Sequence, residues 1–170
     1  LRPPSLGEQD TLIVSFENRT GDAVFDDTLR LALIVQLEQS PYLRVVPEER
    51  IREELGFMNL REGQPVTRSV AMDVCQRVGA RAVLTGSIAS LGGRYVIGLE
   101  GAECPSGRTL ARRQVEVERK EAVIGSLGQV VSDIRRGLGE SVASIERHDV
   151  PLVQATTASL EALKALSAAD

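Results

Sequence analysis

The chain of 170 residues has the length of one ordinary domain, or of one smaller domain and the start of another. A hydrophobic fraction of 42% and a charged fraction of 26% predict a globular fold with a core, and no apolar run approaches the roughly 20 residues of a membrane span. A net charge of -4 and an aromatic content of 3% argue against nucleic acid as a partner, because such binders carry clustered Lys and Arg and aromatic platforms for bases. We therefore expect neither nucleic-acid binding nor membrane contact by this segment.

The first half of the chain predicts alternating strands and helices. Residues 11–16, "TLIVSF", form an apolar, β-branched run that is typical of a buried strand. A polar elbow, "ENRTGD", leads from this strand into a largely buried helix over residues 29–37, whose leucines recur at i+4. "YLRVVP" then predicts a short second strand, and Pro47 opens a second helix with acidic residues in its first turn.

The second half changes to antiparallel strands. After a third helix between the N-cap Thr67 and Gly79, two apolar segments flank Gly92–Gly93, a pair that permits the positive φ of a tight hairpin turn. "CPSG" predicts another turn before the strand "RTLARRQVEV", and an amphipathic helix is expected from Lys120 to about Glu140. The sequence therefore predicts an α/β (α+β) fold, in which helices pack on a mixed β-sheet that ends in an antiparallel meander.

Three regions are expected along the chain. Residues 1–9 are a linker, residues 10–150 are the α/β domain, and residues 151–170 are a linker and the start of a truncated helical region. Because the chain begins with "LRPPS" and ends in an apolar stripe without a partner, we interpret it as a segment of a longer protein. A homo-oligomer formed through this last helix is one expectation. The stripe consists of Leu160, Leu163 and Leu166.

Several short motifs, in their order and spacing, resemble a known family. Residues 14–46, "VSFENRTGDAVFDDTLRLALIVQLEQSPYLRVV", are similar to the start of the TolB amino-terminal-like domain, also called FlgO-like, with its apolar strand, "FxNxTGD" and "LRVV". Residues 73–110 are similar to the helix, glycine hairpin and following strand of that family. "TTASLEALKAL" resembles a segment that often leads into tetratricopeptide repeats. Cys104 and Pro105 depart from the polar turn that members often have at this place.

The resemblance implies an accessory domain without catalytic activity or cofactor. In bacteria, such domains lie between a membrane-anchored serine/threonine kinase domain, an adenylate cyclase or a winged-helix regulator and a tetratricopeptide array. In the kinase architecture the domain lies outside the cytoplasm, in the periplasm. The first hypothesis is therefore a sensor or protein-interaction module of such a kinase, with an unidentified protein partner or small ligand. The alternatives are an intracellular accessory domain of a cyclase or transcription regulator, and a small hydrolase.

The elbow is the candidate ligand-binding site. Asn18, Thr20, Gly21 and Asp22 follow a buried strand and precede a helix, a position where backbone amides bind anions in α/β proteins. Asx and Thr side chains also close turns on their own backbone, and Gly supplies positive φ. We favour the structural interpretation, because the neighbouring acidic side chains would repel a phosphate.

Catalytic and metal sites receive little support from the sequence. Glu17, Asp22, Asp26 and Asp27 form a group of carboxylates, but they have neither a paired nucleophile and base nor the spacing of metal ligands. His148 is the one histidine, and its polar surroundings favour an exposed or helix-terminal position. We therefore predict no catalytic residues and no metal site.

The two cysteines, Cys75 and Cys104, lie far apart and form no CxxC motif, so a zinc site is not expected. Two alternatives remain open from the sequence: two buried or free thiols, which we favour, and a disulfide between them.

Overall fold

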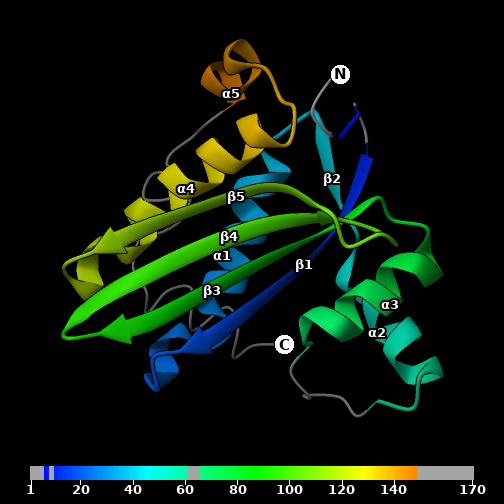
Figure 1. Cartoon of the computed structure of the whole chain (residues 1–170), viewed down its shortest axis with the longest axis horizontal. Coiled ribbons are helices and arrows are strands. Elements are labelled where there is room, and N and C mark those ends of the chain that lie inside the picture. The colour runs from blue at the N-terminus through cyan, green and yellow to red at the C-terminus, as the bar shows by residue number, and fades with distance from the viewer. Residues whose placement is uncertain (1–5, 8–9, 61–65, 149–170) are drawn as a thin grey trace.

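A five-stranded mixed β-sheet forms the centre of the structure, a computed structural model that describes residues 6–7, 10–60 and 66–148 (Figure 1). The strands are β1 (Asp10–Arg19), β2 (Leu43–Val45), β3 (Ala82–Leu91), β4 (Arg94–Glu103) and β5 (Thr109–Val117). The α-helices are α1 (Thr28–Glu38), α2 (Glu48–Phe57), α3 (Arg68–Val78), α4 (Val123–Gly137) and α5 (Val142–His148), with short 3-10 helices at Ala23–Phe25 and Lys120–Ala122.

The strand order is β2-β1-β3-β4-β5, and the pairing changes from parallel to antiparallel in the middle of the sheet. β1 pairs parallel with both β2 and β3, whereas β3, β4 and β5 form an antiparallel meander. Leu91 pairs with Arg94 across the turn, and both Gly92 and Gly93 have positive φ, of 59° and 82°. The predicted mixed sheet and its glycine hairpin are therefore confirmed.

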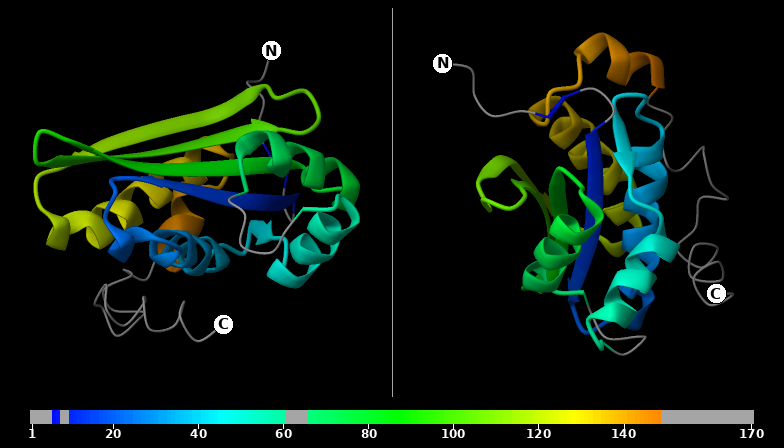
Figure 2. Two further views of the ribbon diagram at one scale, coloured as in Figure 1. Left: turned by 90° about the horizontal axis from the view of Figure 1, so that it is seen from below. Right: turned by 90° about the vertical axis from the view of Figure 1, so that its right-hand side faces the viewer.

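One face of the sheet is covered by α1 and α4, which form the main core with it (Figure 2). Alternate residues of the strands, such as Leu12, Leu84 and Leu99, point to this face and are almost fully buried. α4 contributes the regular apolar stripe that the sequence predicts. Its buried apolar residues are Val123, Ile124, Leu127, Val130, Val131 and Ile134.

The other face is covered only in part. α3 packs against β1 and β3, and α2 packs on α3. Ile13 and Val83, the neighbours of the main-core residues on their strands, are buried beneath these helices. Figure 1 shows α2 and α3 near one end of the sheet, while the β3–β4 hairpin and β5 extend away from them.

The helix limits of the second half differ from the prediction. The region expected as one helix from Lys120 to about Glu140 begins with a 3-10 turn, and α4 ends at Gly137. A separate short helix, α5, follows at Val142–His148 and was not predicted. The break lies at Gly139, whose positive φ of 118° ends the helix, and Glu140 directly after it binds Arg135.

The ends of the predicted domain lie mostly outside the described residues. The predicted boundary at Pro151, the apolar stripe of the last region and residues 1–5 are among them. Leu6 is described and buried, and its N–H donates to the carbonyl oxygen of Leu138 at 2.9 Å.

A buried polar network joins the end of α4 to the loop between α1 and β2. Arg135 binds the Glu140 carboxylate with two hydrogen bonds of 2.7 and 2.9 Å, and both side chains are fully buried. Ser40 donates to the same carboxylate at 2.9 Å, and its hydroxyl accepts the backbone N–H groups of Tyr42 and Leu43. Burial raises the pKa of Glu140, but the hydrogen bonds from Arg135 and Ser40 outweigh it and hold the pKa below its usual value.

We predict that Glu140→Gln lowers the free energy of unfolding by about 3 kcal/mol, because it removes the negative charge that binds the buried Arg135 guanidinium. Since the folded-state pKa of Glu140 is lowered, its stabilisation is present above the unfolded-state pKa and is lost as pH falls through the folded-state pKa. Urea unfolding at pH 7 and below pH 4 measures both effects. Glu146→Gln, on the exposed surface of α5, is the control; an equal loss in both variants would contradict the role of the network.

Candidate functional site

The elbow after β1 is closed by the side chain of Asn18. Its Oδ1 accepts hydrogen bonds from the backbone N–H of Thr20 at 3.0 Å and from the Thr20 hydroxyl at 2.6 Å. Its Nδ2 donates to the carbonyl oxygen of Asp22 at 2.9 Å and to Asp26 Oδ1 at 2.8 Å. These four bonds use the full hydrogen-bonding capacity of an amide side chain.

Thr20 and Asp22 continue the same network. The Thr20 hydroxyl accepts the N–H of Asp22 at 3.0 Å, and Asp22 Oδ1 accepts the N–H of Val24 as the N-cap of the first 3-10 helix. Lys120, which lies far along the chain, donates to Asp22 Oδ2 at 2.8 Å. Gly21 has φ of 78°, so its predicted positive φ is confirmed.

The elbow therefore has the structural role that we favoured. The side chains of Asn18, Thr20 and Asp22 bind one another, nearby backbone and Lys120, and these bonds fix the turn between β1 and α1. Ligand binding by Asn18, Thr20, Gly21 and Asp22 stays a prediction. A ligand there would have to compete with bonds that the turn already makes.

Each carboxylate near the elbow has its own partner, so the carboxylates do not form one cluster. Glu17 binds Arg19, Asp26 binds Asn18, and Asp27 lies 3.7 Å from Arg30. Within residues 6–7, 10–60 and 66–148, no group of three His, Cys, Asp or Glu residues is arranged to hold a metal ion. His148 is exposed on α5, with Nδ1 2.9 Å from the carbonyl oxygen of Ser144, and its predicted exposed position is confirmed.

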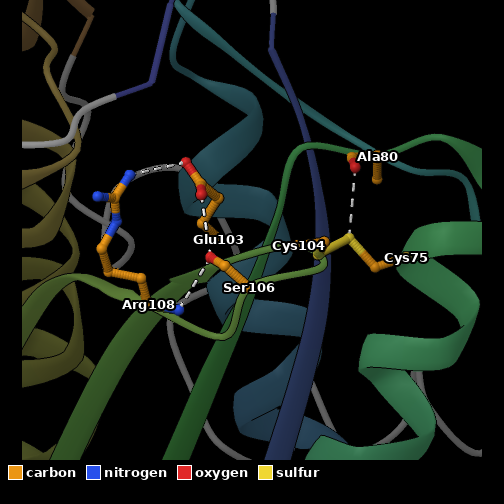
Figure 3. The surroundings of a disulfide bond; sticks show 6 residues. All are labelled: Cys75, Ala80, Glu103, Cys104, Ser106 and Arg108. Carbon is orange, nitrogen blue, oxygen red and sulfur yellow. Dashed lines mark hydrogen bonds and ion pairs between the residues drawn. A yellow bond between two sulfur atoms is a disulfide. The ribbon is translucent and has the colours of Figure 1, made fainter.

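Cys75 and Cys104 form a disulfide, so the favoured interpretation as two thiols was wrong (Figure 3). Cys75 lies on α3, and Cys104 lies directly after β4. The topology brings them together, because β4 runs antiparallel to β3 and ends beside the region where α3 packs. The two cysteines are 29 residues apart in the sequence, and no local motif predicts that they pair. The expected extracytoplasmic location would have favoured it, since oxidising compartments preserve disulfides.

The turn after Cys104 is held by polar contacts, as Figure 3 shows. Ser106 donates to Glu103 at 3.0 Å, and its hydroxyl accepts the N–H of Arg108. The hydrogen bond from Ser106 lowers the pKa of Glu103, and the nearby positive charge of Arg108 lowers it further. These contacts connect β4 to β5 next to the disulfide.

The part of the sheet that α3 leaves uncovered carries ion pairs in its centre. Glu100 on β4 lies between Arg112 on β5 and Arg68 at the start of α3. Its Oε2 lies 3.0 Å from Arg112 Nε, and its Oε1 lies 3.2 Å from Arg68 Nη2. Towards the hairpin, Arg94 binds Glu116 at 3.3 Å and Glu118 at 3.0 Å. The sequence of β5 alternates, and this alternation predicted that polar residues lie on one side of the strand. It did not predict which part of the sheet the helices leave uncovered.

An apolar patch lies on this uncovered surface near the hairpin turn, and we name it the hairpin patch. It consists of Ala89, Leu91 and Val96, which the register places on the same face of β3 and β4. Leu91 is 71% exposed, whereas Ala89 and Val96 are half-buried. Charged side chains adjoin it: Arg19 and Glu116 lie in register with Ala89 and Val96, and Arg94 pairs with Leu91. Sequence analysis missed this patch, because its exposure depends on where α3 ends.

In the part of the chain that the structure describes, no helix has both the length and the apolar character needed to cross a membrane.

Comparison with known proteins identifies the fold but not the family. The sequence matches no protein-family model and no curated protein. The structure is similar to the C-terminal domain of LpoB from Salmonella enterica, with a TM-score of 0.61, 19% identity, and coverage of 67% of this chain and 86% of that one. It is also similar to lipoprotein GNA1162 from Neisseria meningitidis, with a TM-score of 0.54, 16% identity, and coverage of 78% and 97%.

A third similar structure bears on the resemblance found in the sequence. TolB from Acinetobacter baumannii matches with a TM-score of 0.50 and 13% identity, over 78% of this chain and 29% of TolB. The chain therefore has a fold that also occurs in part of TolB and in a bacterial lipoprotein. At these identities, the likeness concerns the fold alone.

We predict that Gly21→Ala lowers the free energy of unfolding by about 1 kcal/mol or more, because a side chain strains a residue at positive φ. Thermal or urea unfolding measures the loss. Gly56→Ala is the matched control: Gly56 lies within α2 with open space around its Cα, so Ala should stabilise the helix by up to about 1 kcal/mol. Equal effects at both positions would contradict the assignment of the elbow as a turn that requires positive φ at Gly21.

Replacing both cysteines by Ala should lower the free energy of unfolding by about 3 to 4 kcal/mol, because the disulfide restricts a 29-residue separation in the unfolded chain. Urea unfolding of the oxidised protein and of the double variant measures this difference. The reduced wild-type protein is the control and should lose a similar amount. A difference below about 1 kcal/mol would mean that the disulfide adds little to the packing of α3.

Proposed function

We propose that this chain is a non-catalytic protein-interaction or sensor module of a larger bacterial signalling protein, and that it works outside the cytoplasm. The hairpin patch carries the proposal. An exposed leucine within an apolar centre and a charged rim is the arrangement typical of protein-binding surfaces.

The partner is expected to be a protein that inserts an apolar side chain between Leu91 and Val96. The rim carries both signs of charge, with Arg19 on the β1 side and the pair of Arg94 and Glu116 on the β5 side, so it favours a polar protein surface of mixed charge over a uniformly charged polymer. The small neighbours of the patch, Ser87 and Gly98, allow a partner to approach the backbone of the sheet.

The disulfide supports a location outside the cytoplasm, because structural disulfides form and persist in oxidising compartments. The similarity of the fold to a bacterial lipoprotein agrees with this location. On the sequence resemblance, the finer proposal is the periplasmic regulatory region of a membrane-anchored serine/threonine kinase with tetratricopeptide repeats. The alternative is an accessory domain of an adenylate cyclase or winged-helix regulator inside the cell. The domain order of the full-length protein separates the two.

A hydrolase is a further alternative that a direct assay tests. The purified chain is incubated with a panel of esters, phosphates and nucleotides. The proposal predicts no turnover with any of them. Turnover that follows the chain through purification and is lost with Glu17→Gln or Asp26→Asn would contradict a non-catalytic role.

The hairpin patch is tested by placing a photoreactive amino acid at position 91 of the full-length parent protein in its own cells. The control places it at position 57, because Phe57 is also highly exposed, at 74%, but lies on α2. We expect crosslinking to a discrete protein from position 91 and not from position 57. The captured protein is then purified and titrated against the chain.

In that titration, Leu91→Asp should weaken binding about tenfold or more, whereas Phe57→Asp should leave it nearly unchanged. Circular dichroism checks that both variants keep the fold. Equal crosslinking from both positions, or undiminished binding by a folded Leu91→Asp variant, would overturn the assignment of the patch.

A further inference from the structure

β5 presents a long edge of the sheet. It contains nine residues and pairs only with β4 among the described strands, whereas β2 at the opposite edge contains three. The side chains of Arg112, Arg113, Gln114 and Glu116 are exposed along it. An exposed edge of this length offers backbone groups to another strand unless it is protected.

The hairpin register identifies which backbone groups face outward. A two-residue turn closes on a hydrogen-bonded pair, here Leu91 with Arg94, and such pairs alternate along antiparallel strands. Continued through β4, this alternation directs the backbone groups of Arg112, Gln114 and Glu116 away from β4. One contact agrees with this direction, because the carbonyl oxygen of Arg112 accepts a hydrogen bond at 2.7 Å from the side chain of Arg113.

The sequence of this edge is complementary to itself. If two antiparallel copies meet with Gln114 opposite Gln114, then Arg112 of each copy stands opposite Glu116 of the other. In this register, the outward backbone groups of all three residues find partners, and the second copy replaces the Arg113 side chain at the Arg112 carbonyl oxygen. Charges at a sheet edge usually repel other strands, but the symmetric placement of opposite charges attracts a copy of the same strand.

We propose that β5 pairs with β5 of a second copy of this chain, forming a continuous antiparallel sheet across a two-fold axis. The ion pairs within each copy extend this arrangement. Glu100 binds Arg112 on one side, and Arg94 binds Glu116 on the other. Negative and positive charges therefore alternate across the axis. Glu100 and Arg112 of one copy are followed by Glu116 and Arg94 of the second copy. This self-association does not depend on the partner proposed for the hairpin patch.

The interface is small and should give a weak dimer whose population rises with protein concentration. Sedimentation equilibrium of the whole chain measures the dissociation constant. Arg112→Glu and Glu116→Arg should each weaken the homodimer about tenfold, because two attractive pairs become repulsive. Mixing the two variants restores opposite charges at both positions, so the mixture should dimerise at least as well as the wild-type chain.

Two further variants separate edge pairing from a loss of fold. Gln114→Pro removes an outward N–H at the centre of the edge, so it should abolish the dimer while circular dichroism remains native. Glu100→Gln removes the ion pair with Arg112 inside one copy but leaves the charges of β5 unchanged, and it should dimerise like wild type.

A wild-type chain that stays monomeric over its whole soluble concentration range would overturn the proposal. So would a dimer that persists in the folded Gln114→Pro variant, because it would form through another surface. Mixed charge variants that fail to dimerise while the wild-type chain does would exclude this register.

Discussion

The disulfide between Cys75 and Cys104 is the constraint on which the arrangement of the second sheet face depends. It joins α3 to the end of β4, and so keeps α2 and α3 at one end of that face. The apolar cluster under these helices is much smaller than the one under α1 and α4, in the part of the chain that the structure describes. A small cluster buries little apolar surface, so a covalent bond supplies stability that packing does not.

The two faces of the sheet are covered unequally. α1 and α4 bury one face almost completely, and the Arg135–Glu140 pair fastens the end of α4 to the loop before β2. On the other face, β3, β4 and β5 extend beyond α3 and present polar ion pairs and the hairpin patch. The surface that we propose for a partner, and the open sheet edge, thus lie where the covering helices stop.

Local sequence patterns predicted most of the fold. The apolar run of β1, the N-cap Thr67 and the glycine pair at the hairpin each act over a few residues, and each is found where expected. The elbow was also predictable as a turn, because Asn and Thr side chains bind nearby backbone.

Features that depend on tertiary contacts could not be predicted in the same way. The Glu140 carboxylate binds Ser40, which lies 100 residues earlier, and the disulfide joins a helix to a later strand end. The hairpin patch arises because apolar residues alternate along β3 and β4 and no helix among the described residues covers this part of the sheet. Its residues look ordinary in the sequence, because exposure is decided by the position of α3.

The redox state of the two cysteines in the living cell tests the central claim, that this module folds outside the cytoplasm around its disulfide. The protein is taken from its own cells, free thiols are blocked with an alkylating reagent, and peptides are analysed by mass spectrometry before and after reduction. Our account predicts that Cys75 and Cys104 are recovered as a linked pair and escape the first alkylation. Full alkylation of both thiols before reduction would contradict it, because the domain would then reside in a reducing compartment without the bond that fixes α3.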